Sequence, residues 1–270
     1  HKRFFIFLFS FCISESVKVA MWTCLLAVVH AYVLQYCSGH EMPYSDTIYN
    51  ELPHFRDTYQ NSESSMIPMF GALFRQYGVE DFIGLQLLHK HFDVYEGELI
   101  VDQHDGNVSI AEPMTWDSLL SIHAPLGVIA HRFKVTESAH LIPLEFSVVS
   151  EQNSFVADAY QQLISPEHAI FLYELSRLLA KFNLLNVFGI GLKSFEKCDT
   201  VETTTDGDRF QVTRSRQDYQ TWMKQALPIQ QQPLFETPVF WDFTEHITRT
   251  GDCFHFCAHC NHCNHHCGHF

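Results

Sequence analysis

The pattern of apolar and polar positions predicts helices that flank blocks of consecutive strands. Apolar residues recur at helical spacing in several segments, namely residues 66–78, 80–92, 155–164 and 166–182. Strand-like stretches, most of them arranged in pairs about a turn, lie between these segments: residues 98–103, 108–113, 127–135, 140–149, 186–193 and 198–216. Asp105-Gly106 is a hairpin signal between two of them. Because regular βαβ alternation is missing from this pattern, it predicts an α+β fold, a single domain with a mostly antiparallel sheet and flanking helices.

Both ends of the chain differ in composition from its middle. Residues 1–37 are largely apolar and begin like a signal peptide, but neither apolar run reaches the ~20 residues of a membrane span. A signal peptide, a membrane anchor and upstream sequence read through before Met21 are the alternatives for this segment. The α+β domain is predicted at 38–250, with a polar, exposed lead-in over 38–65. A Cys/His-rich tail follows at 251–270.

The overall charge limits the partners of this chain. Lys and Arg total 17 against 31 Asp and Glu, which gives a net charge of −14, and no basic run offers a local exception. Duplex nucleic acid is therefore an unsuitable partner for the main domain, because its binding rests on basic charge. None of the nine cysteines lies between residues 39 and 197, which argues against a disulfide-bonded secreted fold. We expect a cytoplasmic or nuclear protein, or a secreted or membrane-anchored one if residues 1–36 are genuine.

The densest chemical signal is the C-terminal run CFHFCAHCNHCNHHCGHF, residues 253–270. It holds five of the nine cysteines and six of the eighteen histidines, and thiolate and imidazole are ligands that zinc prefers. Four of the cysteines follow the C-x2-C-x2-C-x3-C spacing of an iron–sulfur run, but the interleaved histidines favour zinc. A tail that binds metal without a defined site is the alternative. The predicted zinc ligands are drawn from Cys253, Cys257, Cys260, Cys263, Cys267, His259, His262 and His265.

His89-Lys90-His91 is the second constellation of interest. In an extended segment the two histidines would face the same side and share a metal ion, whereas on a helix they would point about 200° apart. The helical spacing of the preceding apolar residues predicts the second arrangement, with a structural role for both histidines, one buried and one exposed. Carboxylates follow closely at Asp93, Glu96 and Glu98. Strand residues His131, Arg132, His140 and Glu145 are possible neighbours across a sheet, although alternation predicts Glu145 in solvent.

The chain contains no nucleophile elbow, phosphate loop or dinucleotide fingerprint. The leading hypothesis is therefore a globular protein that is not an enzyme. Its zinc-binding tail would serve in stability or in interaction with an unknown protein partner. We also expect the domain to fold without that tail. The alternative is a metal-dependent hydrolase that uses His89 or His91 with a nearby carboxylate.

The stretch GLQLLHKHFDVYEGELIVD, followed by IPLEFS and by the Cys/His-rich tail, resembles a group of uncharacterised fungal proteins. The LLHKHF element is the most specific part of this resemblance, which covers roughly residues 70–150 and the tail. The resemblance implies a fungal source. It implies no activity, because no function is associated with that group.

Overall fold

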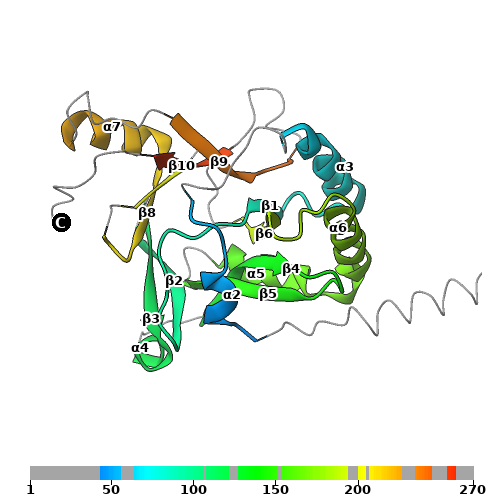
Figure 1. Ribbon diagram of the computed structural model, residues 1–270, viewed down its shortest axis with the longest axis horizontal. Coiled ribbons are helices and arrows are strands. Elements are labelled where there is room, and N and C mark those ends of the chain that lie inside the picture. The colour runs from blue at the N-terminus through cyan, green and yellow to red at the C-terminus, as the bar shows by residue number, and fades with distance from the viewer. Residues whose placement is uncertain are drawn as a thin grey trace, which may run out of the picture.

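In the part of the chain that the computed structural model describes, the strands form one sheet that closes on itself as a barrel (Figure 1). The described residues are 43–55, 64–105, 108–121, 127–150, 154–193, 200–204, 207–226, 235–244 and 254–259. The strand order around the barrel is β1-β6-β4-β5-β2-β3-β8-β7-β10-β9. The strands are β1 (Ile83–Leu87), β2 (Glu98–Asp105), β3 (Val108–Thr115), β4 (Val128–Val135), β5 (Leu141–Val148), β6 (Phe188–Leu192), β7 (Thr200–Thr203), β8 (Gln211–Ser215), β9 (Phe235–Trp241) and β10 (Phe254–His259).

Helices surround this barrel. They are α2 (Asp46–Asn50), α3 (Ile67–Tyr77), α4 (Trp116–Ser121), α5 (Phe155–Leu163), α6 (Ala169–Lys181) and α7 (Arg216–Ala226), with short 3-10 turns η1 (Ser64–Met66) and η3 (Pro166–His168). α3 and α6 lie side by side, and α5 contacts β4 and β6 (Figure 1). Among the described helices, none has the length and apolar character needed to cross a membrane.

Most neighbouring strands run antiparallel, so the predicted α+β class with a mostly antiparallel sheet is confirmed. Within the described strands, the pairs β2–β5 and β7–β10 are parallel. The hairpin predicted at Asp105-Gly106 joins β2 to β3. The helix predicted over residues 66–78 is α3, and it ends at Gly78, whose φ of 63° lies in the left-handed region that glycine adopts readily.

The apolar core lies between the outer face of the barrel and helices α3, α5 and α6. Alternate residues of β1, namely Ile83, Leu85 and Leu87, are buried in this core together with Phe70 and Phe74 of α3. Burial of aliphatic and aromatic side chains of this size contributes about 1.5–3 kcal/mol each. The outer face of β1 therefore fixes the strand against the helices and leaves its other face directed into the barrel.

The inner face of the barrel is polar. Cross-strand neighbours lie on the same face of a sheet, and the register pairs Arg132 with Glu145, Asp102 with Ser147, and Glu202 with Thr213. Asp102, Glu145, Ser147 and Glu202 are among the buried polar residues of the described chain. The fold therefore places α3, α5 and α6 against an apolar exterior and collects charged groups in its interior.

The prediction of a helix over residues 80–92 is wrong, because residues 83–87 form a strand. Pairing with β6 buries every residue of β1. Gly84 meets the ring of Phe240, which would lie 2.3 Å from a Cβ at this position, so a glycine is needed where β1 and β9 approach. The close backbone packing of the sheet decides the structure here, in place of the helical spacing of the apolar residues.

The lead-in predicted over 38–65 is more ordered than its polar composition suggests. Within its described part, α2 begins after Ser45, whose hydroxyl accepts a hydrogen bond from the Ile48 amide in an N-cap. Tyr49, Leu52 and Phe55 are buried. The segment is therefore part of the packed structure, and its apolar residues were too widely spaced to show a period.

Candidate metal centre

The chain remains extended for several residues after β1. The amide of Leu88 donates to the carbonyl of Val187, and the amide of Lys90 donates to the carbonyl of Pro53. The amide of Phe55 donates in turn to the carbonyl of Lys90, so this short segment is held on both sides like a strand. Because residues two apart in an extended chain face the same side, His89 and His91 both enter the interior of the barrel.

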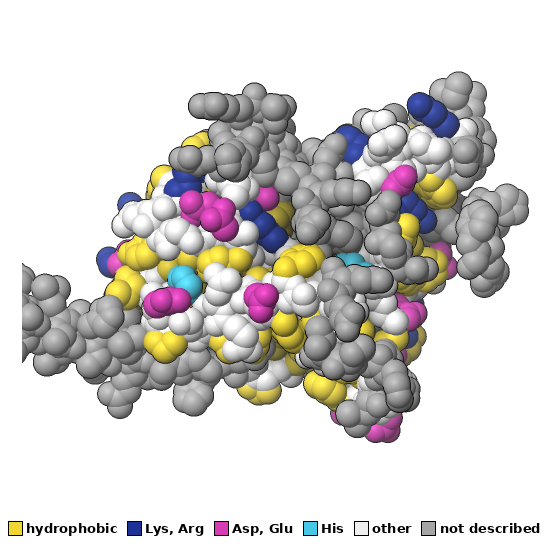
Figure 2. Space-filling model, turned by 180° about the vertical axis from the view of Figure 1, so that it is seen from behind, with side chains coloured by type: hydrophobic (Ala, Val, Ile, Leu, Met, Phe, Trp, Pro, Cys, Tyr) yellow, Lys and Arg dark blue, Asp and Glu magenta, His cyan; other side chains and the backbone are white. Residues whose placement is uncertain are grey.

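Three ligand atoms converge there. Nε2 of His89 lies 3.2 Å from Nε2 of His91, and the two nitrogens lie 3.3 Å and 3.2 Å from the same oxygen, Oε2 of Glu202 on β7. All three side chains are buried, with side-chain exposures of 1%, 2% and 0% for His89, His91 and Glu202. On the face drawn in Figure 2, histidine reaches the surface at only a few points.

Hydrogen bonds to the other ring nitrogens orient both imidazoles. Nδ1 of His89 lies 2.9 Å from the carbonyl oxygen of Leu87, which can only accept, so Nδ1 carries the proton and Nε2 of neutral His89 presents a lone pair. Nδ1 of His91 lies 2.9 Å from the hydroxyl of Thr204. Phe55 stacks on the His91 ring at 4.7 Å. This second contact of each histidine is the arrangement that fixes metal-binding imidazoles.

Burial sets the charge of His91. It lowers the pKa of His91 to about 4, although Glu202 acts in the opposite direction. The imidazole is therefore neutral at pH 7, which is the form that binds metals. Two imidazole nitrogens and a carboxylate oxygen at this separation favour a cation between them.

The distances suit a transition-metal ion. Atoms bound about 2.0–2.1 Å from one ion are about 2.9–3.4 Å apart when the angles run from octahedral to tetrahedral. The observed separations of 3.2 Å and 3.3 Å fall in this interval. Within the described ranges, His89, His91 and Glu202 are the one group of His, Cys, Asp or Glu residues that meets the geometry of a metal site. Their N₂O donor set fits zinc and other first-row divalent ions.

An ion network borders the three ligands. Arg132 of β4 contacts Oε1 of Glu202 through Nη2 at 2.5 Å and Glu145 of β5 through Nη1 at 3.3 Å. Burial alone would lower the pKa of Arg132, but the two carboxylates raise it, so the guanidinium stays charged. Burial raises the pKa of Glu145. Two carboxylates face one guanidinium in this network, and a divalent ion would balance the excess negative charge.

A second polar cluster lies on neighbouring strands. The hydroxyl of Ser109 donates to Asp102, and burial raises the pKa of Asp102 to about 7. Nε2 of His104 lies 3.3 Å from the Ser147 hydroxyl and 3.6 Å from Asp102 Oδ2. Serine and aspartate thus approach the same nitrogen, whereas a catalytic relay places them on opposite nitrogens of the ring. The cluster does not have the geometry of a Ser-His-Asp triad.

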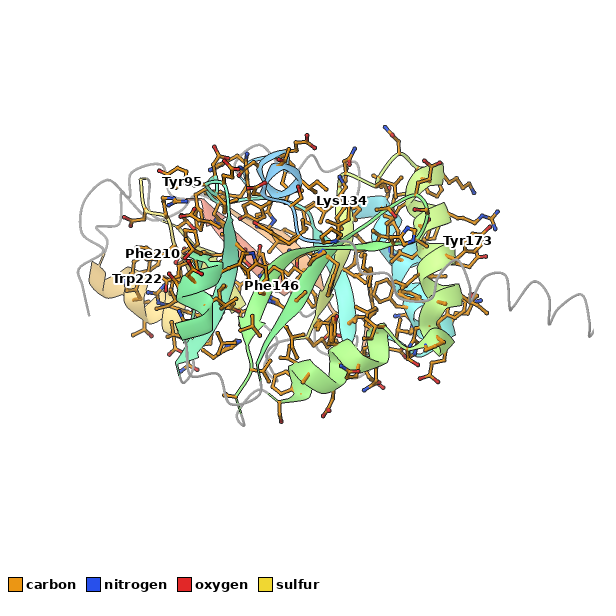
Figure 3. All side chains as sticks on the ribbon, turned by 90° about the horizontal axis from the view of Figure 1, so that it is seen from below. Tyr95, Lys134, Phe146, Tyr173, Phe210 and Trp222 are labelled. Carbon is orange, nitrogen blue, oxygen red and sulfur yellow. The ribbon has the colours of Figure 1, made fainter. Side chains whose placement is uncertain are left out.

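The segment that follows the histidines is tied down at two points. The side chain of Asn50 on α2 donates to the carbonyl of Val94 and accepts from its amide, both at 2.9 Å. Arg209 forms an ion pair with Glu98 and lies over the ring of Tyr95, which Figure 3 labels, at 3.8 Å. Such clamps hold the two ligands from this segment in fixed positions.

The sequence-based expectations for these histidines are wrong in one respect and incomplete in another. The two rings converge instead of diverging, because their segment is extended. The carboxylate that joins them is Glu202, and not one of the nearby acids. Asp93 forms an exposed pair with Lys90, and Glu98 pairs with Arg209. No local pattern marks Glu202, since only the pairing of distant strands brings it to the histidines.

Glu145 was predicted in solvent, and the structure buries it. The register between β4 and β5 shifts on both sides of Arg132. Glu145 still lies on the face opposite Leu144, as alternation predicted, but barrel closure makes that face the buried interior, where Glu145 meets Arg132. His140 takes no part in the network. It lies in the turn before β5, where Nδ1 contacts the Ser138 hydroxyl at 2.8 Å.

Most of the predicted tail ligands lie outside the described residues: Cys253, Cys260, Cys263, Cys267, His262 and His265. Cys257 and His259 belong to β10, whose backbone is described. β10 runs parallel to β7, with Cys257 at the register position beside Glu202. The backbone of the predicted tail thus enters the barrel next to the strand that carries Glu202. The zinc site of the tail itself stays a prediction.

Comparison with protein-family models, with curated proteins and with solved structures finds no match to this chain. The resemblance to the fungal group therefore stays a prediction, and function rests on the geometry of the site.

Proposed function

We propose that this protein is a metal-dependent enzyme whose centre is His89, His91 and Glu202, and that its reaction is a hydrolysis. The observation that supports it most is the convergence of three ligand atoms within 3.3 Å of one another in the barrel interior. Zinc is the proposed ion, since two imidazoles and one glutamate form the ligand set of several zinc hydrolases.

The number of ligands favours catalysis. Structural zinc sites are closed by four protein ligands, whereas catalytic sites use three and keep a position for water or substrate. A bound ion of this kind acidifies its water and polarises a carbonyl or phosphoryl group. The chain itself would supply the charge of Glu202, the fixed imidazoles, and an interior of buried polar groups around the ion.

Burial favours a second candidate, an ion that stabilises the fold. All three ligands are nearly inaccessible, and an ion bound only by the folded state would stabilise it. The tail remains a separate proposal: its thiolates and imidazoles would bind zinc and serve stability or contact with a protein partner. A cytoplasmic or nuclear location is proposed with it.

Metal content of the purified full chain tests the main proposal. His89→Gln, His91→Gln and Glu202→Gln should each lose the same single equivalent of metal that the wild type carries in the barrel. His140→Gln is the matched control, because His140 contacts a serine in a turn and should leave the metal content unchanged.

Hydrolysis of activated carboxylic and phosphoric esters separates enzyme from structural ion. The proposed enzyme loses turnover in a chelator and regains it with zinc, while Glu202→Gln shows none. Metal that binds with full occupancy, raises the melting temperature and supports no turnover would favour the structural ion. An unchanged metal content in all three ligand variants would reject the centre.

A further inference from the structure

We propose that Arg132 is a positioning residue that makes Glu202 a single-oxygen ligand. This inference rests on the proposed metal centre and specifies how its carboxylate is held. Arg132 Nη2 donates a hydrogen bond of 2.5 Å to Oε1 of Glu202, while Oε2 contacts His89 and His91. The two oxygens of one carboxylate therefore have different partners.

Arg132 is itself held in place from its other side. Its Nη1 lies 3.3 Å from both oxygens of Glu145, so the guanidinium bridges two buried carboxylates. The register opposes Arg132 to Glu145 on β5 and to Gly191 on β6. Gly191 has no side chain to compete for the space inside the barrel. The position of Arg132 is thus defined by strand pairing and by two ion pairs.

The chemistry of arginine suits this task. A planar guanidinium offers several N–H donors in a rigid fork, so it can serve two carboxylates at once. A lysine keeps the charge, but its three donors sit on one compact nitrogen without the planar fork. Without the guanidinium, Glu202 would be free to turn both oxygens toward the ion, which would change the coordination number. Partners that hold a ligand in this way typically affect metal affinity by about 10- to 100-fold.

Cobalt(II) binding to the full chain tests the role, because the intensity of its visible absorption reports coordination number. Arg132→Met should weaken cobalt binding by at least about tenfold and change the absorption intensity. Arg132→Lys should recover part of the affinity and not the wild-type spectrum. Glu145→Gln, which retains the shape of the bridge, should give a smaller loss and serves where Arg132→Met does not fold.

Lys193→Met is the matched control. Lys193 pairs with Asp242 at 2.6 Å and is as exposed as Arg132, 15% for each side chain, but this pair does not contact the three ligands. It should leave cobalt affinity and spectrum unchanged, so a general effect of losing an ion pair is separated from positioning.

Wild-type affinity and spectrum in both Arg132 variants would overturn the inference while leaving the metal centre intact. Failure of the centre itself looks different. In that case His89→Gln would leave the cobalt spectrum of the wild type unchanged, or the wild type would show no such spectrum.

Discussion

His89 and His91 direct their Nε2 atoms at the same oxygen of Glu202 and lie 3.2 Å from each other, although Glu202 is 113 residues beyond His89. The two histidines converge because the chain after β1 stays extended, and Glu202 lies beside them because β7 closes the barrel there. The site is thus a consequence of topology.

Acid should destabilise the metal-free protein through His91. Its pKa is lowered from 6.5 to about 4 by burial, so the unfolded chain takes up a proton that the folded chain refuses. The stability that neutral His91 provides is complete above pH 6.5 and is lost as the pH falls toward 4. The loss is at most about 3 kcal/mol. Urea unfolding of the chelator-treated protein between pH 4 and pH 7 measures it.

His91→Gln provides the comparison for that titration. The variant lacks the titrating group, so its unfolding free energy should fall less between pH 6.5 and pH 4 than that of the wild type. Parallel pH profiles for the two proteins would show that His91 is not a buried neutral imidazole.

Asp102 should act in the opposite direction. Burial raises its pKa from 3.8 to about 7, so the folded protein holds a proton that the unfolded chain releases. Its contribution favours folding below pH 4 and is lost as the pH rises through 7. Asp102→Asn removes the cost of burying the charged form. The unfolding free energy of the variant minus that of the wild type should therefore be larger at pH 8 than at pH 4, by up to about 4 kcal/mol.

Asp102→Asn keeps the hydrogen bond from the Ser109 hydroxyl, because an asparagine oxygen can still accept it. Unfolding in urea at the two pH values gives the difference directly. The same stability difference between variant and wild type at pH 4 and pH 8 would contradict a buried, protonated Asp102.

The position of β10 predicts where the chain can be shortened. From sequence, the domain was expected to fold when it ends at Thr250. In the barrel, β10 lies between β9 and β7, so its removal opens the barrel and leaves one edge of each of these two strands unpaired. A chain that ends at His259 should melt cooperatively near the full-length temperature, and one that ends at Thr250 should melt several degrees lower.

Thermal unfolding by circular dichroism compares the three lengths. Equal melting temperatures for the chains that end at Thr250 and at His259 would mean that β10 adds nothing to the barrel. The boundary predicted at residue 250 would then be the better description.

The sequence predicted much of the fold because its local signals were strong. The apolar period that ends at Gly78 gave α3, and Asp105-Gly106 gave the β2–β3 hairpin. α7 was missed, since its sequence RQDYQTWMKQA is mostly polar and buries little beyond Tyr219. Barrel closure is a property of strands far apart in sequence, and no local pattern encodes it.

The site was predictable only in part. His89-Lys90-His91 was identified as a metal-binding pair for an extended chain, but Leu85, Leu88 and Phe92 imitate a helical period, which led to the wrong conformation. Glu202 lies in a short strand without any distinguishing neighbour. Its position beside the two histidines follows from the pairing of β7 with β8 and β10, which no single-sequence pattern reveals.

Zinc K-edge X-ray absorption of the chain that ends at His259, loaded with one equivalent of zinc, reports the ligands of the barrel centre. We expect two imidazole nitrogens and oxygen bound at about 2.0–2.1 Å, without sulfur at about 2.3 Å. His91→Gln should not retain this spectrum. A first shell dominated by sulfur, or failure of the shortened chain to bind zinc, would contradict a centre built from His89, His91 and Glu202.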